Sequence, residues 1–290
     1  MYYLLTLFNG ILVAVMVICN GGLTGSFGLY SATVFIHITG LIGITLYTLL
    51  HREKPFALKM PWYLYLGGII GVATTVFNNV AYGRISVSAI LALCLFGQAV
   101  TSIGTDQIGF MGMPRHPFQK NKLIGLFLIS CGIVLMVTNF EVLAIVMSFF
   151  SGTCLVISRT LNARFAEDVS VGISTFFNYF TGLITAVIIL LLAGRNEPFM
   201  TRPSFSPDIY IYFGGLIGVM AVFISNIVVA RISAFYMTLF MFIGQVFAGL
   251  LLDWLLSGAF SIRNLTGGLF VAAGLSVNLL LERRVEAKQI

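Results

Sequence analysis

The chain has 290 residues, of which 59% are hydrophobic and 9% are Asp, Glu, Lys or Arg. A soluble domain carries about 25% charged residues, so this composition excludes a water-soluble globule, and the 26 Phe and 11 Tyr exclude a disordered chain. The net charge of +6 comes from basic residues scattered through apolar sequence, which form no basic face for nucleic acid. We therefore expect an integral membrane protein that lies in the lipid bilayer and has no nucleic-acid partner.

Ten apolar runs follow one another along the chain, each about as long as a membrane-spanning helix of ~20 residues. They cover residues 3–23, 29–50, 61–82, 86–107, 122–139, 141–160, 170–193, 209–229, 232–256 and 264–282. Short polar segments separate the runs. A lone strand cannot satisfy its backbone hydrogen bonds in lipid, so the pattern predicts an all-α membrane protein with ten transmembrane helices.

The basic residues predict the orientation of these helices. One side of the membrane, which includes the N-terminus, receives twelve of them: Arg52, Lys54, Lys59, Arg115, Lys120, Lys122, Arg159, Arg164, Arg231, Arg283, Arg284 and Lys288. The other side receives four: Arg84, Arg195, Arg202 and Arg263. Loops rich in Lys and Arg stay in the cytoplasm, so we expect both termini to be cytoplasmic.

An internal repeat is the strongest signal in the sequence. Residues Tyr63–Asp106 align without a gap on Tyr210–Asp253, with 14 identities over 44 positions, and Thr39–Ile42 matches Thr181–Ile184. Each copy holds five spans, and after an odd number of crossings the second copy must be inverted. We therefore predict two inverted five-helix repeats, residues 1–140 and 141–290, an arrangement that recurs among secondary transporters.

Few polar residues lie inside the runs, and the sequence places no Asp, Glu, Lys or Arg at the centre of any span. His37 stands alone as an ionisable group, about eight residues into the second run, and its repeat equivalent is Tyr179. A buried ionisable group in a membrane is costly, which favours a functional role as a substrate or proton ligand. The alternative is a neutral imidazole that is hydrogen-bonded to a neighbouring helix.

Two amide pairs repeat in both halves. Gln98 lies twelve residues into its run, about 18 Å deep at ~1.5 Å per residue, and Gln245 reaches a similar depth from the opposite face. These glutamines either bind a polar substrate at the midplane or join helices through hydrogen bonds. Asn79 and Asn226, nearer the helix ends, lean further toward structure. The predicted substrate-binding set is His37, Gln98, Gln245, Asn79, Asn226 and Tyr179, with His37 as the proton-coupling candidate.

Several motifs are absent from the sequence. It contains no P-loop, so ATP does not drive this chain directly. Its four cysteines fall inside apolar runs without the spacing of a metal site, and no nucleophile, base and orienting group occur in a known catalytic pattern. We expect no cofactor, no metal and no enzymatic activity.

Several segments together resemble the YdcZ-like family of the drug/metabolite transporter superfamily, relatives of the EamA exporters. The resemblance depends on His37 with Gly40, PWYLYLGGIIGV at 61–72, Asn78 with Asn79, ISVSAILAL from Ile85, FGQ at 96–98, Asp106 and the Gly109/Gly112 pair. It covers residues 1–140 well and the second half more loosely. It implies a fused five-plus-five transporter of the bacterial inner membrane that exports small solutes. Ser225 opposite Asn78 and Tyr179 opposite His37 depart from the pattern, so we expect an asymmetric site.

These observations predict a secondary transporter that works by alternating access and exports a small polar solute, neutral or zwitterionic, with proton coupling as an option. The alternative is a membrane protein that binds a ligand or holds a partner without transporting anything. Substrate identity, flux direction, the coupling ion and a homodimeric state are left open by the sequence.

Overall fold

The computed structural model describes residues 1–57, 59–112, 122–137, 140–229, 231–232, 234–258 and 261–286, and over these residues the chain is almost entirely helical. The α-helices are α1 (Tyr2–Phe27), α2 (Leu29–Leu50), α3 (Leu66–Ala81), α4 (Val87–Ile108), α5 (Lys122–Met136), α6 (Val142–Asp168), α7 (Val171–Ala193), α8 (Pro198–Thr201), α9 (Gly214–Val229), α10 (Ala234–Ser257) and α11 (Ile262–Glu286). Turns of 3₁₀-helix at Trp62–Tyr65 and Ile209–Phe213 lead into α3 and α9. Each predicted run therefore corresponds to one long helix. Residues 113–121, which include Arg115 and Lys120, lie outside the described residues, as does Lys288. The side chains of Lys122, Arg283 and Arg284 are also outside the description.

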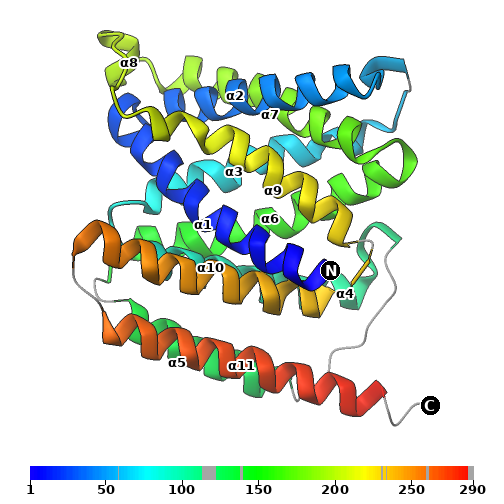
Figure 1. The fold of residues 1–290 in the computed structure, drawn as a ribbon, viewed down its shortest axis with the longest axis vertical. Coiled ribbons are helices and arrows are strands. Elements are labelled where there is room, and N and C mark those ends of the chain that lie inside the picture. Colours follow the sequence, from blue (N-terminus) through cyan, green and yellow to red (C-terminus); the bar gives the residue numbers. More distant parts are fainter. Residues whose placement is uncertain are drawn as a thin grey trace.

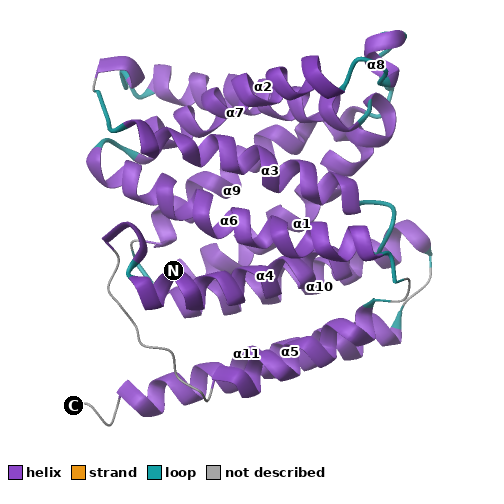
Figure 2. Ribbon diagram, turned by 180° about the vertical axis from the view of Figure 1, so that it is seen from behind, coloured by secondary structure: helices purple, strands orange, loops and turns teal. Residues whose placement is uncertain are grey.

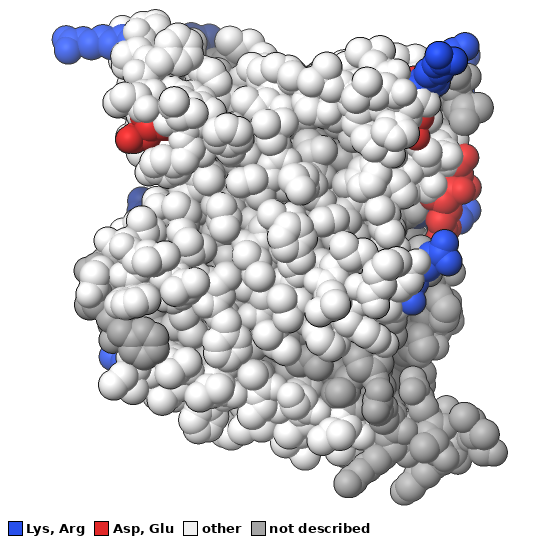
Figure 3. All heavy atoms as spheres, in the orientation of Figure 1, with Lys and Arg blue, Asp and Glu red and all other residues white. Residues whose placement is uncertain are grey.

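The helices confirm an all-helical membrane protein. Among the described residues, seven helices are long and apolar enough to cross a membrane, and three further apolar helices, within α5, α10 and α11, are shorter. The helices run roughly side by side, and Figure 3 shows that Lys, Arg, Asp and Glu gather at their two ends, with an uncharged band between them. Such a band is what a hydrocarbon core of about 30 Å requires of the surface that faces it.

Each of the main helix contacts between the two halves has an equivalent contact in which the two halves have changed places. Helix α1 packs against α9 and α10, while α6, its counterpart in the second half, packs against α3 and α4. Three further contacts join a helix to its own counterpart: α2 with α7, α4 with α10, and α5 with α11. Figures 1 and 2 show α2 with α7 at one end of this stack of helices and α5 with α11 at the other.

Glycine pairs let these helices approach closely. A Cβ atom at Gly97 of α4 or at Gly152 of α6 would overlap a backbone carbonyl of the facing helix, and the same holds for Gly10 of α1 and Gly244 of α10. Small residues at a crossing bring helix backbones together and increase van der Waals contact, which drives helix association in lipid. The two crossings are equivalent, so the glycines fix the same geometry in both halves.

Two carboxylates from the second half cap helices of the first half. Glu197, after α7, accepts hydrogen bonds of 2.7 Å from the backbone N–H groups of Tyr30 and Ser31 at the start of α2. Asp253 of α10 accepts bonds of 3.0 Å from the N–H groups of Val87 and Ser88 at the start of α4. A carboxylate stabilises a helix N-terminus because it satisfies free N–H groups and opposes the helix dipole.

Ser86 also caps α4, since its hydroxyl accepts a bond of 3.2 Å from the N–H of Ala89. Its repeat equivalent, Ser233, lies outside the described residues.

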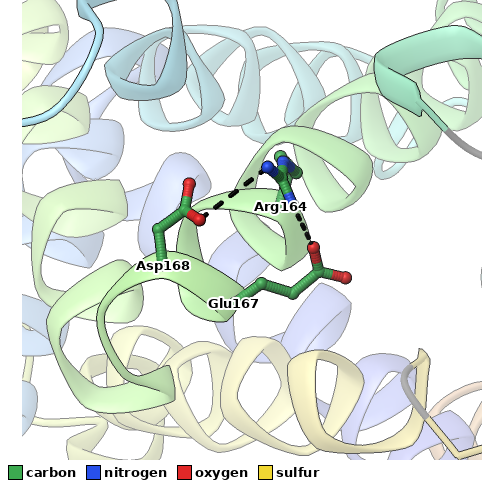
Figure 4. Close-up of polar contacts among 3 residues, drawn as sticks. All are labelled: Arg164, Glu167 and Asp168. Atoms are coloured by element: carbon green, nitrogen blue, oxygen red, sulfur yellow. Dashed lines mark hydrogen bonds and ion pairs between the residues drawn. The ribbon is translucent and has the colours of Figure 1, made fainter.

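The predicted end of the sixth span, residue 160, is wrong. Helix α6 continues to Asp168, and Arg164 near its end pairs with Glu167 and Asp168 one turn further on (Figure 4). The polar residues after Cys154 suggested a loop, but one-turn spacing lets such residues stabilise a helix end through ion pairs. Arg159, assigned to that loop from the sequence, therefore lies inside the helix.

Candidate functional site

A cavity of about 120 Å³ lies between the two halves of the molecule. Eight helices line it, four from each half: α1, α2, α3 and α4 with α6, α7, α9 and α10. Helices α5 and α11 contribute no lining residue. This cavity is the candidate functional site, since membrane transporters bind solutes between their repeats.

The cavity has a polar wall and an apolar wall. The polar wall comes from α3, α6 and α7 and consists of Thr74, Thr75, Asn78, Ser158, Arg159, Asn162 and Asn178. The apolar wall consists of Val13, Met16, Ile36, Ala221 and Val222 from α1, α2 and α9, and these helices also contribute the polar residues Asn20, His37, Ser225 and Asn226 to the lining. In Figure 1, α1 and α9 lie in front of α3 and α6.

The two walls occupy equivalent places in the two halves but differ in chemistry. By the repeat alignment, Thr74 and Thr75 of α3 correspond to Ala221 and Val222 of α9, and Ser158 of α6 corresponds to Met16 of α1. The backbone is thus nearly two-fold symmetric, while the side chains make an asymmetric site.

His37 and Tyr179 line the cavity at equivalent positions on α2 and α7, and their ring centroids are 5.7 Å apart. Each ring packs on a glycine of the other helix, Gly182 under His37 and Gly40 under Tyr179, where no Cβ atom would fit. His37 Nδ1 lies 2.8 Å from the carbonyl oxygen of Thr33. A carbonyl only accepts, so this geometry assigns the proton to Nδ1 and leaves Nε2 as an acceptor in the neutral ring.

Arg159 gives the polar wall a permanent positive charge. It lies nine residues before the end of α6 at Asp168, about 14 Å along the helix. Its Nη1 lies 3.9 Å from Met241 Sδ across the cavity, and sulfur is a weak acceptor. In the part of the chain that the structure describes, no carboxylate forms an ion pair with it. The assignment of Arg159 to a loop is therefore wrong, since this residue lies inside α6.

Hydrogen bonds fix the amides of the polar wall. Asn162 Nδ2 donates to Asn178 Oδ1 at 2.8 Å, and Ser158 Oγ donates to the carbonyl of Gly67 at 2.8 Å. Ser151 Oγ donates to Asn78 Oδ1 at 2.7 Å. Because these partners lie on neighbouring helices, the wall is held in place before any solute binds.

Three other lining atoms are buried without a hydrogen-bond partner: Asn20 Oδ1, Thr74 Oγ1 and Asn226 Oδ1. A buried polar atom in a native protein nearly always has a partner, so these three residues carry the unsatisfied hydrogen-bonding capacity of the lining.

The structure brings three of the six predicted site residues to the cavity, His37, Tyr179 and Asn226. The other three, Gln98, Gln245 and Asn79, are buried but do not line it. Gln98 directly follows Gly97, the glycine at which α4 crosses α6, and donates to Cys94 Sγ at 3.6 Å. Gln245 directly follows Gly244, the glycine at which α10 crosses α1. Their contact with a substrate stays a prediction.

Metal binding finds no support among the described residues, where no group of three His, Cys, Asp or Glu side chains is placed to hold an ion. The two capping carboxylates, Glu197 and Asp253, are outside the cavity lining. The ionisable groups that do line it are His37, Cys94, Arg159 and Tyr179.

Comparison with known proteins agrees with this architecture. The model of a family described as "Putative inner membrane exporter, YdcZ" matches the chain twice, over residues 1–135 and again over residues 143–277. Among 22 chains of solved structures that match, one titled "Crystal structure of protein" has a TM-score of 0.67 and 18% sequence identity, with 98% of each chain covered. This likeness shows a shared fold. No curated protein matches the chain in sequence.

Proposed function

Because the chain belongs to the YdcZ family of inner-membrane exporters, we propose that it is a secondary transporter that exports a small polar organic solute. In this proposal ten helices cross the inner membrane as two inverted five-helix repeats, residues 1–140 and 141–290, with both termini in the cytoplasm. The repeats exchange conformations and open the central site to alternate sides of the membrane. Since the sequence has no P-loop, an ion or solute gradient supplies the energy.

The main support is the position of the cavity between two sets of four equivalent helices. A site shared by two similar halves is accessible to each side in turn when the halves exchange shape. The cavity of about 120 Å³ is small beside the ~300–1,000 Å³ of sites for drug-sized ligands, which favours a small solute. His37 at the cavity wall is the residue that we propose for proton coupling, because imidazole is the side chain whose unperturbed pKa lies nearest to neutral pH.

Flux through proteoliposomes tests the proposal. The purified protein is reconstituted, and the efflux of organic acids, amino acids, amines and sugars is compared with efflux from empty liposomes, with and without a proton gradient. We expect at least one of these solutes to cross faster with the protein. Saturable binding without flux of any solute would contradict transport and favour a membrane protein that only binds its ligand.

A variant that fills the cavity shows whether it is the transport path. Gly71 lines the cavity, and its Cβ position has ordinary contacts of 3.5 Å, so Gly71→Leu places an apolar side chain in the solute space. We expect this variant to fold and to lose flux. Gly25→Leu is the control, because Gly25 of α1 has no atom within 4 Å of its Cβ position. Equal flux in both variants would show that the solute takes another route.

A further inference from the structure

The guanidinium of Arg159 lines the cavity but has no role in the proposed function as stated so far. A charged group inside a membrane protein is costly, and such groups normally pair with each other, bind backbone carbonyls or face a water-filled pathway. Arg159 has only the sulfur of Met241, 3.9 Å from Nη1, among its described polar contacts. Its remaining N–H groups are available to a ligand that enters the cavity.

Snorkelling to the lipid headgroups does not explain this residue. Arg164, five residues later on the same helix, is the basic residue that reaches the helix end, where Glu167 and Asp168 neutralise it (Figure 4). Arg159 instead lines the cavity and reaches toward α10, which lies on the other side of it. The repeat equivalent of Arg159 is Val17, so the two-fold architecture does not require a charge at this position.

A carboxylate is the ligand that best fits a single arginine in this setting. The planar guanidinium presents its N–H groups in a fork that matches the two oxygens of a carboxylate. One permanent positive charge balances one negative charge, whereas a dianion would carry an uncompensated charge into the bilayer. Among the described residues, no Asp or Glu lines the cavity to pair with an ammonium group.

The rest of the cavity indicates the body of the solute. In the same cavity, the apolar wall of Val13, Met16, Ile36, Ala221 and Val222 offers contact to a short hydrocarbon segment. Asn20 and Asn226, whose side-chain carbonyl oxygens have no hydrogen-bond partner, also line the cavity. We infer that the solute is a small monocarboxylate with a short apolar body, bound through Arg159; this inference rests on the proposed function.

Matched ligands that differ only in charge test the inference. One set shares a hydroxylated four-carbon skeleton: 3-hydroxybutyrate, 3-hydroxybutyramide and 4-amino-2-butanol. A second set shares a phenyl group: phenylacetate, phenylacetamide and 2-phenylethylamine. Inorganic phosphate, assayed above its second pKa so that HPO4²⁻ predominates, serves as the dianion. Thermal stabilisation of the detergent-purified protein is measured against ligand concentration. We expect at least one acid, but neither the amides nor the amines nor phosphate, to raise the melting temperature in a saturable way.

Three variants on one helix separate the charge from the fold. Arg159→Gln removes the charge, and we expect at least a tenfold loss of acid affinity. Arg159→Lys keeps a point charge without the fork, and we expect partial recovery, which also shows that the site is folded. Arg164→Gln is the control because Arg164 is exposed and does not line the cavity; we expect wild-type affinity.

The outcomes distinguish this inference from the proposed function. If an amide, an amine or phosphate stabilises the protein as well as the best acid, or Arg159→Gln retains the acid's effect, the inference is wrong. It is also wrong if no acid stabilises the wild type. In each of these cases flux of a neutral or cationic solute in proteoliposomes would still support export. Arg159-dependent acid binding without flux of any solute would instead support the site and contradict transport.

Discussion

Single residues decide which proton the cavity can exchange. His37 and Tyr179 occupy equivalent positions, and each lies on the glycine of the opposing helix. Both line the cavity. As free side chains an imidazole titrates near pH ~6.5 and a phenol near ~10, so His37 is the one of the two rings that we propose for proton coupling. The other ionisable groups that line the cavity are Cys94 and Arg159.

We predict that His37→Gln removes the pH dependence of transport. Glutamine retains a donor near the carbonyl of Thr33 but cannot take up a proton at neutral pH. The measurement is initial flux at fixed solute concentration between about pH 5 and pH 8, the range in which histidine titrates. Tyr179→Phe is the matched control and should keep the wild-type profile. An unchanged profile in His37→Gln would assign His37 to helix packing alone.

The sequence predicts depth in the membrane better than it predicts direction. Asn78 and Asn79 are neighbours, yet Asn78 lines the cavity and Asn79 does not. One residue turns the side chain by about 100° around the helix axis, and the repeat alignment alone does not show which side faces the centre. Gln98 and Gln245 are buried as expected, but they directly follow Gly97 and Gly244 at the helix crossings, so they lie between helices.

Arg159 was missed for a different reason. Polar residues that follow an apolar run look like a loop, and the predicted span ended at residue 160. A better signal is the spacing of Ser158, Arg159 and Asn162, which lie within one turn and share one helix face. In the structure this face belongs to the polar wall, and the exposed ion pairs begin only at Arg164.

At the scale of helices, close crossings depend on positions where no side chain fits. Gly97 of α4 meets the backbone of α6 at Phe149, so a Cβ atom there overlaps a carbonyl oxygen and no rotamer change relieves the overlap. Gly104, seven residues later on the same helix, has no atom within 4 Å of its Cβ position. The two glycines form a matched pair.

We predict that Gly97→Ala lowers the free energy of unfolding and that Gly104→Ala does not. Alanine favours the helix by up to about 1 kcal/mol over glycine, which applies at both positions. At Gly97 the overlap adds an overpacking cost of about 1–3 kcal/mol or more, because α4 must move away from α6. Denaturant titration in detergent micelles measures both variants. Equal stability of the two would mean that α4 and α6 do not cross at Gly97.

The helices themselves were predicted well because lipid leaves the backbone little choice. Every predicted run corresponds to a long helix, and the predicted membership of the YdcZ family is confirmed. The short helix α8 was missed inside a polar segment, although Pro198 at its first turn is a typical start signal. A helix of four residues such as α8 is too short to show a hydrophobic pattern, so the sequence around Pro198 does not predict it by itself.

At the scale of the whole molecule, the two halves share hydrogen-bonded pairs as well as helices. Asn78 of α3 accepts from Ser151 of α6, and at the equivalent crossing Asn9 of α1 donates to Ser225 of α9 at 2.9 Å. The asparagine and the serine have exchanged helices while the bond between them persists. Such an exchange weakens the sequence match between the halves, although the packing is the same. The departure of Ser225 from the pattern thus preserves a contact.

The orientation of the whole molecule follows from charge. Removing Arg159 from the predicted tally changes twelve basic residues against four to eleven against four, and the direction of the bias is unchanged. Lys and Arg in short loops remain on the cytoplasmic side, so the side that holds Lys54 is expected to be cytoplasmic. Lys54 lies between α2 and α3, and Arg202 directly follows α8. Figure 1 shows α8 at the opposite end of the helices from the N-terminus.

We predict that a membrane-impermeant maleimide labels Arg202→Cys but not Lys54→Cys in intact cells. Each variant is made in a background in which Cys19, Cys94, Cys131 and Cys154 are replaced, because all four are free thiols. Both positions are exposed, so permeabilised cells should show labelling of both and provide the control for reactivity. The reverse pattern would place both termini outside. Labelling of both variants in intact cells would reveal two orientations, which the bias of eleven to four disfavours.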